Sequence, residues 1–400
     1  MGFMKRCSFA AAAALVLAGI ISGCCGPEIA YEKKKTLPPD MREITLPKVE
    51  KDCKIRGAGT FDVVYYDVKS QPFSLEGLPF LAENNGEYYR TPMRLTRAET
   101  SYGVKNLSKH TSGAAVRFRS DAPGIVLRAE LFHSYDMNHM CRMASAGFDI
   151  YCKAENGKLV YNRSIQPDAK QIYIKAVAGI NPGKGVCDWV VNLPLYGGVK
   201  RIEIGIPAGY KLEAPVPHKV SKPILFYGSS ITQGACASRP GMAYTSMLCR
   251  AVDAEQINWG FSGNAKGEPA LAEEIAKLDL AAFVYDYDYN APTVKHLAKT
   301  HEKFFRIIRD KNPDLPIIMI SKVNGVRSSS TVARRNVILK TYNNALARGD
   351  KNVYFVDGIK FFGDEDREEC TVDNVHPNDL GFYRMYKGVL PTLKKALKLQ

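Results

Sequence analysis

The sequence predicts two domains: an all-β, jelly-roll-like sandwich, followed by an α/β domain built on a parallel sheet. Its 400 residues exceed the size of one average domain and suit two. Short segments that alternate between apolar and polar residues fill residues 45–215, whereas strand-like and helix-like segments alternate over residues 220–400. Pro215, Pro217 and Pro223 lie where one pattern gives way to the other and mark the boundary.

The beginning of the chain is typical of a targeting segment rather than of a fold. Lys5 and Arg6 precede an apolar run of 13 residues, 9–21. Such a run is too short to cross a hydrocarbon core of ~30 Å comfortably. We therefore expect a secretory signal peptide over residues 1–23.

The signal ends in Ile-Ser-Gly-Cys at residues 21–24, which resembles a bacterial lipobox. The resemblance implies that Cys24 is lipidated and becomes the first residue of the mature protein, although a plain cleaved signal with an accidental cysteine is the alternative. Residues 24–44 carry prolines and a lysine run and are expected to form a tether. An exported cell-envelope lipoprotein is expected, and the lack of Asp after Cys24 favours the outer membrane. No later segment is long and apolar enough to span a membrane, so the lipid anchor is the one membrane attachment expected.

The chain is basic, with a net charge of +14. Loss of Lys5 and Arg6 with the signal leaves +12, from 14 − 2. The basic residues are scattered apart from the run at residues 33–35, and no nucleic-acid-binding motif accompanies them. A solvated basic surface is therefore expected, without a nucleic-acid partner.

Ten cysteines are present, of which Cys7, Cys24 and Cys25 fall in the signal or at the anchor. The seven others (10 − 3) are irregularly spaced and include no CxxC pair, so no metal site is expected. Export would permit disulfides, but the sequence does not define a pairing. The oligomeric state is equally undefined.

The alternating segments of residues 45–215 predict half-buried antiparallel strands. Representative segments are 61–66, 115–119, 125–131, 148–151 and 199–206. No long helical stripe interrupts them, so a β-sandwich is the expected arrangement.

In residues 220–400, continuous apolar runs predict strands that are buried on both faces. The predicted strands are 224–227, 256–261, 280–287, 316–320 and 353–356. The predicted helices are 243–252, 269–278, 292–310 with Pro292 in its first turn, one that includes 338–346, and 378–399. This alternation implies a parallel sheet with helices on both faces.

Chemistry-bearing residues follow the predicted strands, at the edge where such sheets bind ligands. Ser230 lies in a Gly-bounded turn after the first strand, Gly263 follows the second, and Asn290 follows the third. Asp373 precedes His376 by three residues, a spacing that lets a carboxylate orient an imidazole.

Each of these features has an ordinary explanation when it is taken alone. Ser230 could cap a helix, Gly263 could serve a loop, and Asn290 could cap the helix after Pro292. His376 could be a solvated loop residue. The four blocks in this order are far more specific than any one of them.

Together the blocks resemble the SGNH hydrolase superfamily, also called GDSL esterases, over about residues 222–398. The resemblance implies a flavodoxin-like α/β/α domain with a five-stranded parallel sheet. It also implies a serine esterase with Ser230 as nucleophile, His376 as base and Asp373 as its orienting carboxylate. The oxyanion hole would consist of the Ser230 N–H, the Gly263 N–H and the Asn290 amide. No metal or organic cofactor is expected.

The upstream region carries a second resemblance. Gly-Phe-Asp-Ile-Tyr at residues 147–151 is similar to the GxDLY signature found in the amino-terminal domain of some bacterial members. The two-domain layout also resembles that of carbohydrate acetylesterases in which a jelly roll precedes the hydrolase.

Two blocks depart from the family pattern. Ser229 stands where an Asp usually precedes the nucleophile, and Asp288-Tyr289-Asn290-Ala291 replaces the usual Gly-x-Asn-Asp. These changes put the rim of the acyl pocket in doubt rather than the triad. No Gly-x-Ser-x-Gly elbow follows a strand, which argues against the ordinary α/β-hydrolase fold.

The expected substrate is a small acyl ester, most simply an acetyl ester on an oligo- or polysaccharide. Tyr287, Asp288 and Tyr289 are expected to crowd the oxyanion hole, and no long apolar lid is present. A thioesterase or lipase-type hydrolase, a non-catalytic glycan-binding lipoprotein and an acyl-transfer enzyme remain alternatives.

Overall fold

The computed structural model describes residues 48–134, 136–153, 157–183, 185–323 and 328–400. The predicted signal peptide, tether and lipidation site at Cys24 therefore lie outside the described residues. Residues 47–400 make up one compact unit that contains both predicted domains.

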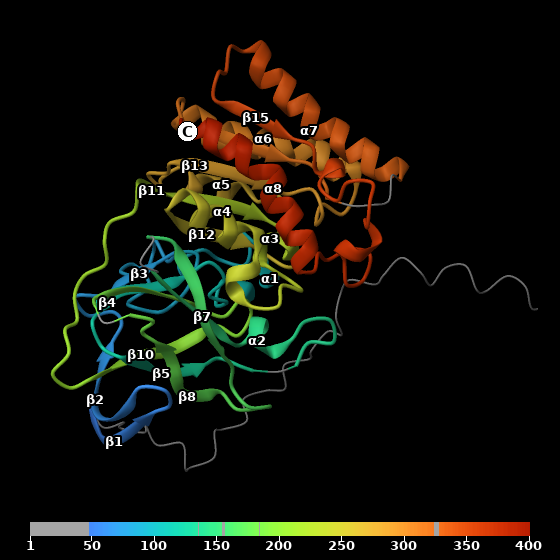
Figure 1. The fold of residues 1–400 in the computed structure, drawn as a ribbon. Helices are drawn as coiled ribbons and strands as arrows, with labels where there is room; N and C mark the ends of the chain where they lie inside the picture. The colour runs from blue at the N-terminus through green and yellow to red at the C-terminus, as the bar shows by residue number, and fades with distance from the viewer. Residues whose placement is uncertain (1–47, 135, 154–156, 184, 324–327) are drawn as a thin grey trace, which may run out of the picture. The chain divides into compact units, whose positions relative to one another are not determined.

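Ten antiparallel strands of the described residues form two five-stranded sheets, shown from blue to green in Figure 1. One sheet has the order β1-β2-β10-β5-β8 and the other the order β3-β4-β9-β6-β7. The strands are β1 (Val49–Ile55), β2 (Gly59–Asp67), β3 (Ser74–Glu76), β4 (Ala115–Ser120), β5 (Gly124–Leu131), β6 (Phe148–Lys153), β7 (Leu159–Ile165), β8 (Tyr173–Ile180), β9 (Cys187–Asn192) and β10 (Val199–Pro207). Both sheets contribute to one apolar core, in which Phe118, Trp189 and Ile204 are fully buried. The predicted β-sandwich is confirmed.

The second sheet system is parallel and has the order β12-β11-β13-β14-β15. Its strands are β11 (Val220–Gly228), β12 (Ala254–Gly260), β13 (Ala282–Asp286), β14 (Ile317–Ile320) and β15 (Val353–Val356). The predicted five-stranded parallel sheet is confirmed. Because β11 has β12 on one side and β13 on the other, the direction of winding reverses there, and such a reversal opens a crevice at the carboxyl ends of the strands.

Helices cover both faces of the parallel sheet (Figure 1). The helices of this domain are α3 (Ser230–Gln233), α4 (Tyr244–Val252), α5 (Pro269–Ile275), α6 (Val294–Lys311), α7 (Ser329–Ala347) and α8 (Asp379–Ala396). Along β11, Ile224 and Phe226 pack against α4 and α8, whereas Leu225 and Tyr227 pack against the layer of α5, α6 and α7. This alternation explains why the strand is a continuous apolar run.

One predicted helix begins later than expected. Pro292 does not lie in the first turn of α6, because the helix starts at Val294. The hydroxyl of Thr293 accepts the His296 N–H at 3.0 Å and caps the helix, so this local hydrogen bond sets its start.

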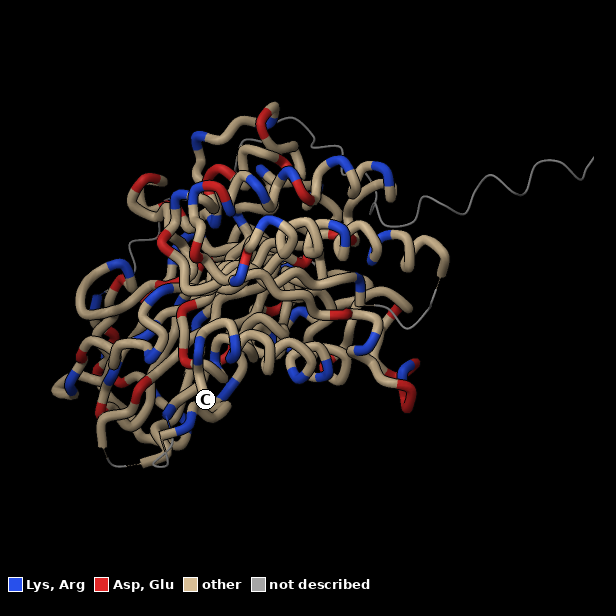
Figure 2. Tube along the Cα trace, turned by 90° about the horizontal axis from the view of Figure 1, so that it is seen from above, with Lys and Arg blue, Asp and Glu red and all other residues tan. Residues whose placement is uncertain are grey.

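The charges of the described residues are spread along the chain. Figure 2 shows basic and acidic residues interspersed along the trace. Within the described ranges, no helix combines the length and apolarity needed to cross a bilayer.

The connection between the sandwich and the parallel sheet is tied to both by His218. Its Nδ1 lies 2.8 Å from a carboxylate oxygen of Asp253, and its Nε2 lies 3.1 Å from one of Glu76 in β3. Burial alone would lower the pKa of His218, but the two carboxylates outweigh it and raise the pKa to about 9.

We expect the fold to lose the stability that this interaction provides as the pH becomes alkaline. A histidine with a raised folded pKa stabilises the fold fully below its unfolded pKa of about 6.5, and the stabilisation is lost as pH rises through about 9. Urea unfolding measures the free energy of unfolding across this pH range. Below the unfolded pKa, the value for wild type should exceed that for His218→Gln by on the order of 2 kcal/mol, and the difference should vanish above the folded pKa. His296→Gln, whose ring contacts the Lys266 carbonyl, is the matched control. A constant difference between wild type and His218→Gln would contradict the expectation.

Candidate functional site

The turn after β11 presents Ser230 at the start of a short helix. Ser229 is the N-cap of α3, and its hydroxyl accepts the Ile231 N–H at 3.2 Å. Gly228 is required here, because a Cβ at that position would lie 2.1 Å from the Thr232 hydroxyl and 2.3 Å from the Asp286 carbonyl. Ser230 is therefore held in the first helical turn, where N–H groups have no intrahelical acceptor.

The loop before α8 brings His376 and Asp373 to this serine. The Ser230 Oγ lies 2.9 Å from the His376 Nε2, although 146 residues separate them along the chain. The His376 Nδ1 lies 2.8 Å from the Asp373 carboxylate. Because an ionised carboxylate can only accept, the Nδ1 carries the proton and the Nε2 is left to accept one from the serine.

The Asp373 carboxylate is held in its ionised form. Partial burial works against ionisation, but hydrogen bonds from the backbone and the ring of His376 outweigh it and lower the pKa of Asp373. It therefore stays charged throughout the neutral range.

The turn after β12 and the loop after β13 meet beside the nucleophile turn. The Phe261 N–H donates to the Gly228 carbonyl at 2.9 Å, and the Asn290 side-chain amide donates to the Phe261 carbonyl at 2.8 Å. Gly263 adopts φ +69°, and nothing lies within 4 Å of where its Cβ would be. The Asn290 amide has a second hydrogen available for an acceptor in the crevice. The helix-cap explanation of Asn290 is wrong, because Thr293 caps α6.

Two of the three residues expected to crowd the oxyanion hole point elsewhere. Tyr287 is 1% exposed and its hydroxyl donates to the Lys266 carbonyl inside the α5–α6 layer. Asp288 is fully buried and accepts the Lys322 N–H at 2.8 Å, and burial raises its pKa to about 7. For these two residues the prediction is wrong: the ring of Tyr287 gains more from burial in the core than from exposure at the rim, and the Lys322 N–H holds the Asp288 carboxylate in the interior. Only Tyr289 of the three is partly exposed, and its hydroxyl contacts the Val323 carbonyl.

The GxDLY-like segment binds the α/β domain. Asp149 in β6 is fully buried and accepts from the Arg239 guanidinium at 2.6 Å and from the Gly241 N–H at 2.9 Å. The Tyr151 hydroxyl lies 2.5 Å from the same guanidinium. A few residues before Gly241, the backbone and hydroxyl of Ser238 donate to Asp379 at the start of α8. The GxDLY-like segment therefore binds residues 238–241, which follow the turn of Ser230. The same residues bind the start of α8, which follows the loop of His376.

Two further residues position the site, and sequence reasoning did not single them out. Arg90 is fully buried, and its guanidinium donates to the carbonyls of Asn258 and Gly260 at 2.7 and 2.8 Å, which holds the end of β12. Gln233 in α3 accepts the Ser262 N–H at 3.0 Å and so links the helix of the nucleophile to the turn of Gly263. No local pattern marks a buried arginine. Gln233 lies in the same Gly-bounded segment as Ser230, but nothing in that segment indicates its contact with Ser262.

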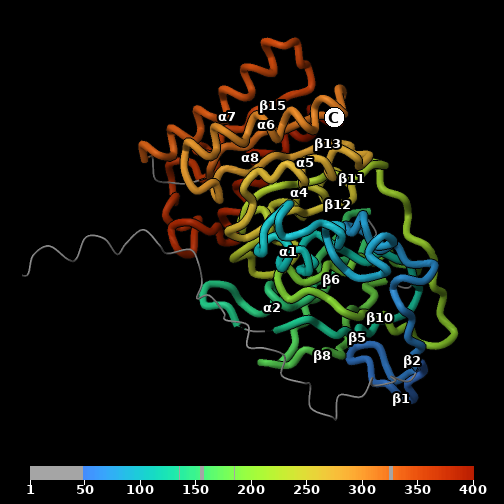
Figure 3. Tube along the Cα trace, turned by 180° about the vertical axis from the view of Figure 1, so that it is seen from behind, coloured from blue at the N-terminus to red at the C-terminus, as the bar shows by residue number. Residues whose placement is uncertain are grey.

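The sandwich also contacts the turn after β12 through α1 (Tyr102–Leu107). Seen from behind, α1 lies between the sandwich and the α/β layers (Figure 3). Gly103 packs so closely on Asn264 that a Cβ would lie 1.9 Å from the amide oxygen. Through this contact, the sandwich supports the turn that contains Gly263 and Asn264.

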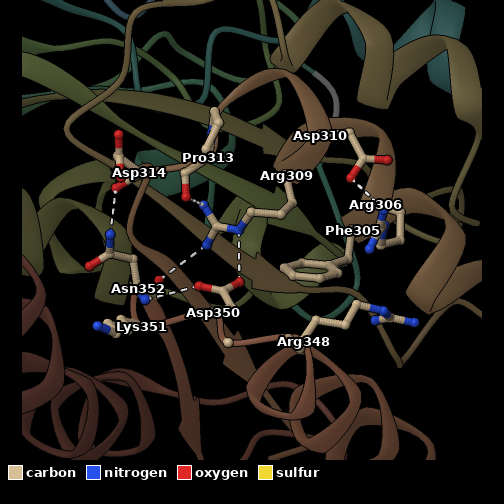
Figure 4. Close-up of a pocket in the computed structure, with 12 residues that line it drawn as sticks. Phe305, Arg306, Arg309, Asp310, Pro313, Asp314, Arg348, Asp350, Lys351 and Asn352 are labelled. Atoms are coloured by element: carbon tan, nitrogen blue, oxygen red, sulfur yellow. Dashed lines mark hydrogen bonds and ion pairs between the residues drawn. The ribbon is translucent and has the colours of Figure 1, made fainter.

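The cavity drawn in Figure 4 lies where β14 and β15 begin, whereas Ser230 and Asn290 follow the ends of their strands. It has a volume of about 490 Å³ and is lined by residues that precede β14 and β15. The Arg309 guanidinium there pairs with Asp350 at 2.8 Å and donates to the carbonyls of Asn312, Pro313 and Leu315. Its polar groups stabilise a turn, and none of the candidate site residues lines it.

The fold and the side chains gathered at the carboxyl ends of β11, β12 and β13 define an ester hydrolase of the SGNH class. Residues 221–394 match the GDSL-like lipase/acylhydrolase family, and residues 63–212 match the amino-terminal domain of SGNH-hydrolase-type esterases. A GDSL-like lipase from Bacteroides ovatus ATCC 8483 is 32% identical, with a TM-score of 0.74 over 84% of this chain and 99% of that one. The chain belongs to this family.

More distant structures share the fold. The salicylyl-acyltransferase SsfX3 from a tetracycline biosynthetic pathway has a TM-score of 0.68 and 19% identity over 82% of this chain and 95% of its own. The acetyl xylan esterase Est2A from the rumen bacterium Butyrivibrio proteoclasticus has a TM-score of 0.52 and 14% identity over 84% of this chain and 99% of its own. No curated protein matches the chain.

Replacement of Asn290 by alanine tests the oxyanion assignment. We expect kcat for ester hydrolysis to fall roughly 10²–10³-fold with little change in KM, since the lost donor acts mainly on the transition state. Asn344→Ala, which removes an amide bonded to Glu302 on the far helix layer, is the matched control. A rise in KM at constant kcat would place Asn290 in substrate binding instead.

Proposed function

We propose that the chain is a serine esterase in which Ser230 attacks the ester carbonyl and His376 acts as general base. The observation that carries the proposal is the relay from the Ser230 Oγ to the His376 Nε2 at 2.9 Å and from the His376 Nδ1 to Asp373 at 2.8 Å. In this geometry the histidine has one nitrogen for the serine proton and the other fixed by a charge that stabilises the imidazolium.

The reaction follows from this arrangement in two steps. The Ser230 oxygen bonds to the carbonyl carbon as its proton passes to the His376 Nε2, and the tetrahedral oxyanion accepts from the Ser230 N–H, the Gly263 N–H and the Asn290 amide. The imidazolium returns the proton to the departing alcohol, which leaves an acyl-serine. Water then attacks the acyl group with His376 again as base, and the carboxylic acid and the free serine result.

We propose a small acyl group, acetyl, carried on a carbohydrate. An acetyl xylan esterase shares the fold over 84% of this chain, which supports this substrate class. Tyr289 precedes Asn290 in the chain and its side chain is partly exposed, so we propose that it narrows the acyl site and favours a short acyl group. The similarity to an acyltransferase keeps transfer to a second sugar hydroxyl as the competing outcome, because both reactions share the acyl-serine.

The substrate proposal is tested by acetate release from a set of acetylated polysaccharides, together with p-nitrophenyl esters from acetate to palmitate. Purified protein should release acetate and prefer the shortest esters, and Ser230→Ala should do neither. A preference for long chains would indicate a lipase or thioesterase. Acetylated acceptor sugars in the mass spectrum would indicate transfer. Turnover that survives Ser230→Ala would remove the nucleophile assignment.

We also propose that the protein is an exported lipoprotein anchored through Cys24. The support is the lipobox-like Ile-Ser-Gly-Cys ending at that residue. Cys24→Ser should shift the protein from the membrane fraction to the soluble fraction, whereas Cys25→Ser should remain with the membrane. The reverse result would move the anchor by one residue.

A further inference from the structure

Three atoms that could ligate a soft or borderline metal ion lie close together, and one of them belongs to the catalytic histidine. They belong to His139, Cys236 and His376, and all three lie within 4.8 Å of one another. His139 comes from the loop between β5 and α2 (Arg142–Ser145) of the sandwich, and Cys236 follows α3 in the α/β domain. The group therefore exists only because the two domains meet, which is why CxxC spacing could not reveal it.

Both imidazoles are held as metal-ligating histidines usually are. The His139 Nδ1 lies 2.9 Å from the Asn138 side-chain oxygen, and the His376 Nδ1 lies 2.8 Å from the Asp373 carboxylate. Each of these oxygens accepts, so each Nδ1 donates and each Nε2 keeps its lone pair. A hydrogen bond of this kind to the second nitrogen fixes the tautomer and the orientation of a ligating ring.

The Cys236 thiol lies close to both histidines. The Cys236 sulfur lies 3.1 Å from the His139 carbonyl, and the residue is 7% exposed. The two rings have their centroids 5.2 Å apart. Two imidazoles and one thiolate are a ligand set suited to Zn²⁺. Bond lengths of about 2.0–2.3 Å imply ligand atoms roughly 3.5 Å apart, so the three segments that carry the ligands need to approach one another by only about an ångström.

We propose that His139, Cys236 and His376 bind a Zn²⁺-type divalent cation, and that the bound cation switches the esterase off. The cation takes the lone pair of the His376 Nε2, which is the group that must accept the Ser230 proton. The Cys236 thiol releases its proton to solvent on binding. A fourth position stays open for water or for the Ser230 oxygen. The inhibitory half of this inference rests on the proposed function, whereas cation binding does not.

Binding is tested without reference to catalysis. The purified protein is titrated with Co²⁺ as an absorbing substitute, and with Zn²⁺ in competition with a chromogenic chelator. We expect a thiolate-to-cobalt charge-transfer band in wild type and in Ser230→Ala. His139→Ala and Cys236→Ser should each weaken Zn²⁺ binding at least roughly tenfold, as loss of a ligand or its support does, and Cys236→Ser should also lose the band.

Cys141→Ser is the matched control. Cys141 belongs to the same contact between domains, with its sulfur 3.1 Å from the Ser238 carbonyl, but it is not part of the ligand group. It should bind Co²⁺ and Zn²⁺ as wild type does. Absence of binding in wild type, unchanged binding in both His139→Ala and Cys236→Ser, or loss of binding in Cys141→Ser would each overturn the site.

Inhibition is measured separately, as the fraction of each variant's own metal-free ester hydrolysis that remains at increasing Zn²⁺. Wild type should be inhibited and recover with EDTA, and the half-inhibiting concentration should rise at least roughly tenfold in His139→Ala and Cys236→Ser. Cation binding without inhibition of an active wild type would overturn the switch and leave the site. Cation binding by a protein with no esterase activity would overturn the proposed function alone.

Discussion

Ser230→Ala is expected to lower kcat for ester hydrolysis by roughly 10⁴–10⁶-fold, because a triad without its nucleophile retains only the oxyanion hole and substrate binding. The comparison is made with p-nitrophenyl acetate under saturating conditions, with thermal unfolding as a check on the fold.

The adjacent serine provides a matched control. Ser229→Ala removes the cap of α3, whose hydroxyl accepts the Ile231 N–H. It should cost about 1 kcal/mol of stability but keep kcat within about tenfold of wild type, since the Ser230 side chain and its histidine are untouched. Equal losses of activity in the two variants would mean that the turn, rather than the Ser230 hydroxyl, is what the reaction needs.

Asp149→Ala is expected to lower the free energy of unfolding by roughly 3–5 kcal/mol, because it leaves the Arg239 guanidinium without its buried partner. Asp149 is fully buried and also accepts from the Gly241 N–H and from the Asn192 amide at 2.8 Å, so three donors lose their acceptor together. Urea unfolding measures the change directly.

An exposed ion pair supplies the control for this measurement. Asp279 pairs with Lys222 at 2.7 Å, but its side chain is 77% exposed. Asp279→Ala should therefore change stability by less than about 1 kcal/mol. A similar loss in both variants would show that Asp149 contributes no more than a surface charge and would remove the linking role of the GxDLY-like segment.

The fold could be predicted from the sequence because strands and helices leave patterns within a few consecutive residues. Every predicted strand of the parallel sheet lies in an observed strand or overlaps it, since a run such as Ile224–Tyr227 has no stable place except between two covered faces. The alternating segments of the sandwich follow the same logic with a period of two. The blocks around Ser230, Gly263, Asn290 and His376 were also visible, because each is a short segment with its own turn chemistry.

The sequence did not show where side chains turn once the strands end. Tyr287 and Asp288 were expected at the crevice and lie in the interior, because burial and a hydrogen bond from the Lys322 backbone decided their direction. Nothing near Arg90 in the chain signals that its acceptors are the carbonyls of Asn258 and Gly260.

What the sequence determined by itself was the succession of strands and helices and the identity of the four blocks. The tertiary structure alone decided that Ser230 meets His376, that Asp149 meets Arg239, and that His139 stands beside Cys236. These pairs are 146, 90 and 97 residues apart. Local propensity acts over a few residues, whereas such contacts arise only when separate apolar layers pack and carry their loops together.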